Sequence, residues 1–238
     1  MFKRSRTSSV IAISAAALNR AALMNTRSVG AGGPFVLGDI GPIDAALDLD
    51  PQWACDLVGR SLAGADALLL ETWSGVFASS KAQRFLETSA NPGGLPVLLS
   101  LTYKRGADGS PVLPDYSLDA KTVARLAKIT GGIAALGVNC GRDIGMDEVI
   151  EVVRRYRQET DLPLFARPNA GTPVRDGDRW VYPHTPEQMA ARLPELLEAG
   201  VSMVGGCCGT TPAHIAAFRP VVAAWNARLT PPSSTPEG

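Results

Sequence analysis

Three of the four cysteines in this 238-residue chain lie in two short motifs that each follow an apolar run. Asn139-Cys140 ends one run, and Cys207-Cys208 stands in the segment Val204–Pro212 after another. Adjacent side chains on a regular strand point to opposite faces, but flanking glycines let the backbone leave the strand and turn both sulfurs toward one point. Three thiolates at the ends of two strands would form an open zinc site whose fourth position is left for a substrate.

The vicinal pair Cys207-Cys208 has two other interpretations, a buried structural pair and a redox-active pair. The surrounding glycines and the partner motif Asn139-Cys140 favour zinc ligation by Cys140, Cys207 and Cys208. The fourth cysteine, Cys55, lies in an apolar helical segment, which predicts a small buried side chain.

The two histidines, His184 and His214, are not at ligand spacing from the cysteines. We expect structural or solvent-exposed roles for both of them. Trp180 and Tyr182 follow the turn residues Asp176–Asp178, a pattern that predicts a hairpin-like loop over the carboxyl ends of the strands.

Six short apolar runs are typical of buried parallel strands. They are Phe35–Asp39, Ala67–Glu71, Val97–Thr102, Ile133–Val138, Leu164–Arg167 and Val201–Val204. Segments with helical periodicity alternate with these runs. They are Ile11–Ser28, Gln52–Ala63, Val76–Thr88, Lys121–Lys128, Met146–Glu159, Thr185–Glu198 and Pro212–Arg228.

Alternation of strands and helices predicts a parallel sheet covered by helices. Polar residues follow the ends of successive strands, as in (β/α)8 barrels, whose active sites are built at that rim from several strands. We therefore predict an α/β fold, a TIM-like (β/α)8 barrel that is incomplete at its N-terminus, with about six strands present. One barrel domain over residues 11–228 is expected, with disordered segments at 1–10 and 229–238.

Composition narrows the class of protein. Lysine plus arginine equals aspartate plus glutamate, 23 against 23, so the chain has no net charge that would favour a nucleic-acid or membrane-surface partner. Four cysteines are too few for a disulfide framework in a chain of this length, which favours a reducing cytoplasm. The basic and apolar N-terminus has the outline of a signal peptide, but a helix over Ile11–Ser28 is the favoured interpretation.

Five motifs at strand ends together resemble the homocysteine S-methyltransferase family. In chain order they are Gly38–Pro42, Gly64–Asp66 with Glu71-Thr72, Gly137–Cys140, Pro168–Gly171, and Gly205–Pro212 with His214-Ile215. The resemblance runs from about Asn19 to Val222, and its two cysteine motifs are the specific part. This family has the zinc-dependent homocysteine-binding barrel that also occurs in cobalamin-dependent methionine synthase.

The resemblance implies that zinc held by Cys140, Cys207 and Cys208 takes the homocysteine sulfur as fourth ligand and keeps it deprotonated. Glu71 would bind the homocysteine amino group. Asn139 is a second candidate substrate-binding residue, with support of the cysteine loop as its other interpretation. The implied partners are homocysteine and a small-molecule or corrinoid methyl donor, and a corrinoid or folate donor would come from a partner protein.

The chain also departs from the family pattern. The first two strands of the family, which end in Asp-Gly-(Gly/Ala)-x-Gly-Thr and near Thr-Asn-Thr-Phe, have no counterpart in this sequence. Six strands leave a gap in an eight-stranded barrel, which a partner chain or a second copy would have to close. The alternative to a methyltransferase is therefore a truncated or degenerate barrel that binds zinc or a partner subunit without catalysis.

Overall fold

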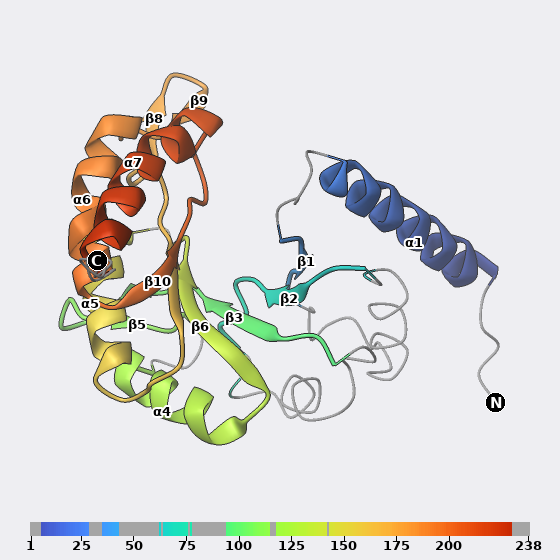
Figure 1. Ribbon diagram of the computed structural model, residues 1–238, viewed down its shortest axis with the longest axis horizontal. Coiled ribbons are helices and arrows are strands. Elements are labelled where there is room, and N and C mark those ends of the chain that lie inside the picture. The colour runs from blue at the N-terminus through green and yellow to red at the C-terminus, as the bar shows by residue number, and fades with distance from the viewer. Residues whose placement is uncertain are drawn as a thin grey trace, which may run out of the picture. The chain divides into compact units, whose positions relative to one another are not determined.

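The computed structural model describes residues 6–28, 35–42, 62, 64–75, 77, 94–114, 118–141 and 143–229. Within them, the chain is an α/β protein built on one six-stranded parallel sheet, with strand order β1-β2-β3-β6-β7-β10 (Figure 1). These strands are β1 (Leu37–Ile40), β2 (Ala67–Leu70), β3 (Val97–Leu101), β6 (Ile133–Asn139), β7 (Leu164–Arg167) and β10 (Val201–Val204). Each lies on one of the six apolar runs, so the prediction of the strands is confirmed.

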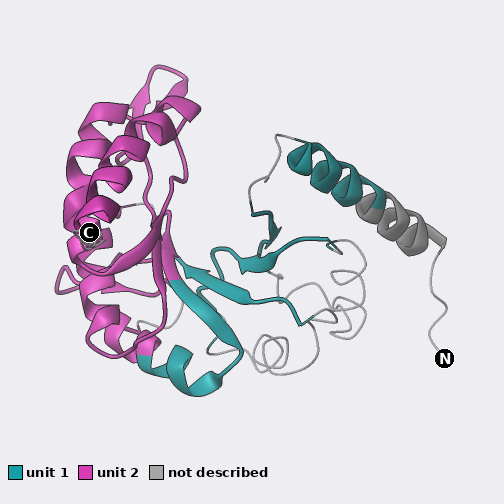
Figure 2. Ribbon diagram, viewed as in Figure 1, with its two compact units in different colours: residues 1–101, 125–136 teal, residues 102–124, 137–238 magenta. Residues whose placement is uncertain are grey.

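The chain divides into two compact units (Figure 2). Unit 1 comprises residues 1–101 and 125–136, and unit 2 comprises residues 102–124 and 137–238. In unit 1, β2 pairs in parallel with β1 on one side and with β3 on the other. All residues of β2 and β3 are buried, as expected for central strands of a parallel sheet.

Helix α1 (Arg6–Arg27) precedes these strands and confirms the predicted helix near the N-terminus. Its last residue, Arg27, donates to the carboxylate of Asp66 at 2.9 Å. Asp66 also accepts the backbone N–H of Val36 at 2.7 Å, so the carboxylate ties the segment before β1 to the turn before β2. The predicted helices over residues 52–63 and 76–88, Cys55, residues 1–5 and the tail from 230 lie, apart from Leu62 and Phe77, outside the described residues.

Among the described residues, three further long helices lie in unit 2, and a fourth runs from unit 2 into unit 1. Strand β10 pairs in parallel with β7, α5 (Met146–Arg157) packs against β7, and α6 (Pro186–Glu198) packs against both β10 and α7 (Pro212–Leu229). Helix α4 (Ala120–Thr130) buries Val123, Ala124 and Ala127 on one face. All four lie on segments predicted to be helical.

Local sequence explains where two of these helices begin. Thr185 accepts the N–H of Gln188 with its hydroxyl, while the Gln188 side chain accepts the N–H of Thr185, a reciprocal cap that Pro186 continues at the first helical position. In α5 the buried Glu148 side chain likewise accepts the N–H of Gly145, and it also pairs with Arg105.

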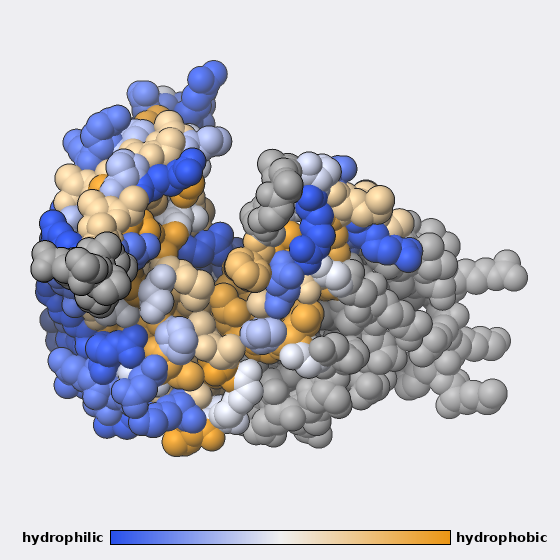
Figure 3. Space-filling model, in the orientation of Figure 1, coloured by the Kyte–Doolittle hydropathy of each residue, from blue (hydrophilic) through white to orange (hydrophobic). Residues whose placement is uncertain are grey.

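Two short antiparallel hairpins lie in unit 2. Strands β8 (Val174–Asp176) and β9 (Arg179–Val181) form the hairpin that the turn residues before Trp180 predicted. Its tip carries polar side chains, which form the blue projection at the top of Figure 3. Strands β4 (Lys104–Arg105) and β5 (Pro111–Val112) form a second hairpin that was not predicted.

A pair of tyrosines marks the core of unit 2. The hydroxyl groups of Tyr103 and Tyr156 lie 2.7 Å apart, the rings meet edge to face, and both side chains are fully buried. Burial raises the pKa of both phenols, because a buried phenolate would lose its hydration. The pair is therefore held in its neutral, hydrogen-bonded form.

A helix that spans a membrane needs about 20 consecutive apolar residues, and the helices in the described part of the chain can be held against that requirement. None of them is both long enough and apolar enough to cross a bilayer.

Candidate metal centre

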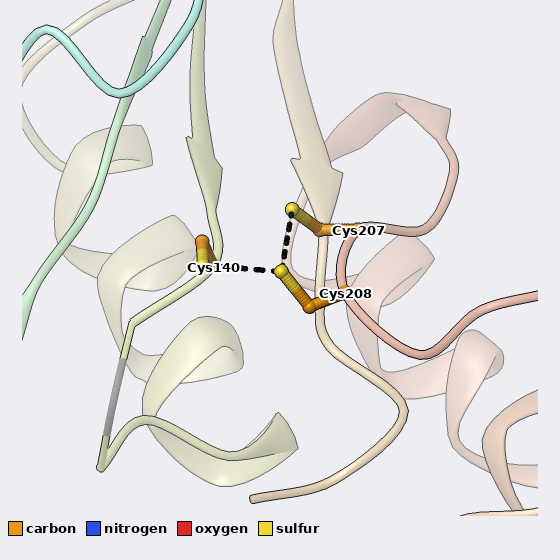
Figure 4. A group of neighbouring side chains, drawn as sticks. All are labelled: Cys140, Cys207 and Cys208. Atoms are coloured by element: carbon orange, nitrogen blue, oxygen red, sulfur yellow. Dashed lines mark hydrogen bonds between the residues drawn. The ribbon is translucent and has the colours of Figure 1, made fainter. Parts of the chain in front are cut away.

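Cys140, Cys207 and Cys208 come together in unit 2 although 68 residues separate the first from the last (Figure 4). Cys140 follows β6 directly, and the other two stand on the loop after β10. The Sγ atom of Cys208 lies 3.8 Å from that of Cys140 and 4.0 Å from that of Cys207. All three sulfurs lie within 4.8 Å of one another.

The backbone at Cys140 is what turns its sulfur toward the others. Cys140 has a φ of 57°, in the left-handed region that residues with a side chain seldom adopt, and Gly141 follows with a φ of 107°. A Cβ atom on Gly141 would lie 2.6 Å from Cβ of Ile144, so only glycine fits there. Such a conformation costs about 1–3 kcal/mol and persists where the surrounding structure imposes it, commonly at functional sites.

The loop that carries Cys207 and Cys208 is held by hydrogen bonds that continue the pairing of β7 with β10. The N–H of Cys207 donates to the carbonyl of Pro168 at 3.0 Å, and the N–H of Ala170 donates to the carbonyl of Cys208 at 2.9 Å. Thr210 closes the turn, since its hydroxyl donates to the Cys207 carbonyl at 2.7 Å. The two cysteines therefore sit on a fixed backbone.

Asn169 joins the two cysteine loops. Its Oδ1 accepts the N–H of Cys208 at 3.2 Å, and its Nδ2 donates to the carbonyl of Gly141 at 3.1 Å. The side chain is buried, with 7% of its surface exposed. Because one amide binds the backbone on both sides, Asn169 sets the distance between Cys140 and Cys208. Its place in the Pro-Asn-Ala-Gly motif was visible in the sequence, but its bridging role was not predicted.

Asn139 points its amide at the sulfur of Cys207. Its Nδ2 lies 4.0 Å from that sulfur, and the side chain is buried, with 1% exposed. This contact agrees with the interpretation of Asn139 as support for the cysteine loop.

Protons are shared unequally in the cluster. A hydrogen bond from the Cys207 thiol lowers the pKa of Cys140 to about 5, with smaller contributions from the backbone N–H of Gly141 and from the side chains of Cys208 and Asn169, although burial opposes this. The same contact with Cys140, together with burial, raises the pKa of Cys207 far above its usual value. Of these two thiols, Cys140 is therefore the one that loses its proton more readily.

The donor set fits a zinc ion. With zinc–sulfur bonds of about 2.3 Å, two sulfurs of a tetrahedral site lie about 3.8 Å apart. The Sγ–Sγ separations of 3.8 Å (Cys140 to Cys208) and 4.0 Å (Cys207 to Cys208) match this edge within a few tenths of an ångström. Cys140, Cys207 and Cys208 can thus supply three of four ligands, and the exposed position of Cys208 leaves room for a fourth.

Glu71 and His214 are the remaining residues that the sequence analysis singled out within the described residues. Glu71 follows β2 in unit 1, is partly exposed, and precedes Thr72, which has a left-handed φ of 64°. His214 is buried, and its Nδ1 accepts the N–H of Thr211 at 3.1 Å, so that Nε2 donates to the carbonyl of His184 at 3.0 Å. These contacts agree with a structural role for His214.

Solved structures with similar folds include α/β-barrel enzymes. A pyruvate carboxylase variant from Rhizobium etli, crystallised with acetyl coenzyme A, aligns with a TM-score of 0.56 over 92% of this chain and 23% of that chain, at 14% identity. A putative phosphonomutase from Burkholderia cenocepacia J2315 aligns with a TM-score of 0.50 over 85% of this chain and 79% of that chain, at 19% identity. These likenesses show the fold alone and agree with the predicted α/β barrel class.

Sequence relatives are more specific. Methionine synthase of Mycobacterium tuberculosis H37Rv is 32% identical over 193 residues, which cover 76% of this chain and 15% of the relative. Methionine synthase of Mycobacterium leprae is 32% identical over 167 residues, which cover 68% of this chain and 13% of the relative. The chain thus spans about a seventh of the length of these relatives. Residues 3–222 match the family model described as homocysteine S-methyltransferase, and the chain belongs to that family.

Proposed function

We propose that this chain transfers a methyl group to the thiol of homocysteine, forming methionine, with zinc as its cofactor. The observation that supports the proposal most directly is the group of three sulfurs within 4.8 Å, at the ends of two strands of a family member. The relatives named methionine synthase agree with it.

Zinc bound there would keep the homocysteine sulfur deprotonated and nucleophilic near neutral pH. The residues of the chain would bind and position the ion. Cys140, Cys207 and Cys208 hold the ion, Asn139 donates to one of the sulfurs, and Asn169 fixes the spacing of the two loops. Buried amides of this kind orient metal ligands, and their loss typically costs 10- to 100-fold in metal affinity.

We also propose that Glu71 receives the homocysteine amino group in a charge-assisted hydrogen bond. The family resemblance and its place directly after β2 support this role. Glu71→Gln should raise KM for homocysteine and leave zinc stoichiometry unchanged. An unchanged KM for homocysteine in Glu71→Gln would contradict the proposed role of Glu71 in substrate binding.

The function is tested by metal content and methyl transfer measured on the same preparations. We expect wild type to bind one zinc per chain and to form methionine when homocysteine and a panel of methyl donors are supplied. Cys207→Ser should lose both properties. Cys55→Ser is the matched control, because it removes the one cysteine outside the cluster, and it should keep both.

The second candidate, zinc binding without turnover, makes a different prediction. Such a protein would contain stoichiometric zinc, lose it in Cys207→Ser, and show no change at the metal when homocysteine is added. A wild-type protein that binds no zinc would contradict both candidates.

A further inference from the structure

His214 in the first turn of α7 is buried, with 5% of its surface exposed, and each of its ring nitrogens has a backbone partner. Nδ1 accepts the N–H of Thr211 at 3.1 Å, and the Thr211 hydroxyl lies 3.0 Å from the same nitrogen. Nε2 donates to the carbonyl of His184 at 3.0 Å. Because a backbone N–H only donates and a carbonyl only accepts, these two partners require the ring proton to be on Nε2.

The contact with Thr211 is a helix cap, and a cap does not require histidine. In a capping box, Glu or Gln at the third helical position accepts the N–H of the N-cap residue. Helix α6 has this arrangement, with Thr185 at the N-cap and Gln188 as the acceptor. Helix α7 repeats the pattern Thr-Pro-x-x with His214 in the place of the glutamine. The bond from Nε2 to His184 is therefore what histidine adds to the cap.

His184 connects this bond to the metal centre. Its N–H donates to the carbonyl of Ala170 at 3.0 Å, and the N–H of Ala170 donates to the carbonyl of Cys208 at 2.9 Å. The ring of His184 also packs on Gly171, since a Cβ built there would lie 2.9 Å from the ring. The backbone and the side chain of His184 are thus both held against the loop that follows β7.

These hydrogen bonds form a closed circuit with the loop that carries the vicinal cysteines. The circuit comprises Cys208, Ala170, His184, His214 and Thr211. It returns to its start along the chain, because Thr211 lies three residues after Cys208. The cysteine loop is therefore held at both ends, by Ala170 at Cys208 and by His214 at Thr211.

We propose that His214 is a positioning residue of the metal centre, which holds the loop of Cys207 and Cys208 in place by donating from Nε2 to His184. The inference rests on the proposed function, because it concerns how the zinc ligands of that function are oriented. His214 acts through the backbone and not as a ligand, since the group of described residues able to hold a metal ion is the three cysteines.

His214→Glu and His214→Gln form a matched pair that isolates the donor. Both side chains can accept the N–H of Thr211 and keep the cap, but only glutamine also carries an N–H. In competition with a chromophoric chelator, we expect His214→Glu to bind zinc about 10- to 100-fold more weakly than wild type, and His214→Gln to recover most of the affinity. Gln188→Glu is the control, because it makes the same change at the cap of α6, and it should bind zinc like wild type.

Two further readouts separate positioning from a loss of folding stability. Urea denaturation of the metal-free variants measures the free energy of unfolding of each one. The absorption of cobalt-substituted protein reports how the sulfurs are arranged around the metal, and it should change in His214→Glu and return in His214→Gln. Wild-type zinc affinity and cobalt absorption in His214→Glu, or equal losses in both variants, would overturn the proposal.

Gly171→Ala tests the same circuit without altering His214, and it decides the question if His214→Glu does not fold. The new Cβ would displace the ring of His184, so zinc binding should weaken. Gly177→Ala is the control, because Gly177 also has a positive φ, 55° against 83° at Gly171, but has open space around the new Cβ. Wild-type zinc affinity in Gly171→Ala would also overturn the proposal.

Nitrogen-15 spectra of the histidine rings measure the tautomer directly. The chain has two histidines, so the spectrum of His214→Gln assigns the signals by loss. We expect the proton of the His214 ring on Nε2. A proton on Nδ1 would contradict the donation to His184 on which the proposal depends.

Failure of this inference is distinguishable from failure of the proposed function. If wild type binds zinc and forms methionine, and His214→Glu does both equally well, the proposed function stands and the positioning role of His214 is wrong. If His214→Glu loses zinc while wild type binds zinc but forms no methionine, the positioning role stands and the proposed function is wrong.

Discussion

Replacing Asn169 by alanine should weaken zinc binding without changing any ligand. The buried Asn169 amide joins the N–H of Cys208 to the carbonyl of Gly141, so its two hydrogen bonds connect the backbones of the two cysteine loops. Two hydrogen bonds at about 1 kcal/mol each give about 2 kcal/mol, which is roughly a 30-fold loss of affinity. This agrees with the 10- to 100-fold that residues supporting metal ligands typically contribute.

The assay is competition for zinc with a chromophoric chelator. Asn25→Ala is the control, since that side chain lies exposed on α1 in the other unit, and it should bind zinc like wild type. Urea denaturation of the metal-free variants measures the loss in folding stability separately. If Asn169→Ala folds and binds zinc with wild-type affinity, the bridge does not position the cysteines and this reasoning is refuted.

Three further changes have defined outcomes. Tyr156→Phe leaves the buried Tyr103 hydroxyl without its partner and should lower the free energy of unfolding by about 1–3 kcal/mol in urea titrations, while the double change of both tyrosines to phenylalanine recovers part of the loss. Gly209→Ala combines a φ of 78° with a tyrosine ring 2.2 Å from the new Cβ and should reduce zinc affinity, whereas Gly109→Ala, at a φ of 82° in open space, should not. In metal-free protein, a pKa of about 5 at Cys140 predicts a rise in thiolate absorbance as pH increases through 5, and Cys140→Ser should remove it. Because the pKa of Cys140 is lower in the folded chain than the ordinary value of 9.0, its ionisation stabilises the fold fully above pH 9. This contribution is lost as the pH falls toward 5.

The strands were predictable because burial in a parallel sheet requires apolar side chains on both faces. Ala67–Leu70 and Val97–Leu101 are wholly apolar except for Ser100, and both are fully buried. The β4–β5 hairpin was missed because Lys104 and Arg105 are exposed and carry no apolar pattern, although Asp108-Gly109 was an available turn signal.

The types and spacing of the residues also predicted that Cys140, Cys207 and Cys208 form a cluster. They did not predict the backbone conformation that brings the three sulfurs together. We expected the glycines around Cys207 and Cys208 to turn the chain, and at the other loop Cys140 itself adopts the left-handed conformation. No local pattern predicts a left-handed cysteine, because the hydrogen bonds that impose it come from distant segments. Asn169 acts through contacts to residues 28 and 39 positions away, which a single sequence does not reveal.

The central claim is that the three-cysteine site accepts the homocysteine sulfur as its fourth ligand. Zinc-edge X-ray absorption of the protein with selenohomocysteine tests it directly, because selenium and sulfur scatter differently. We predict three sulfur neighbours and one light atom before addition, and three sulfur neighbours and one selenium after it. A zinc shell that keeps three sulfurs and gains no selenium at saturating selenohomocysteine would contradict the account.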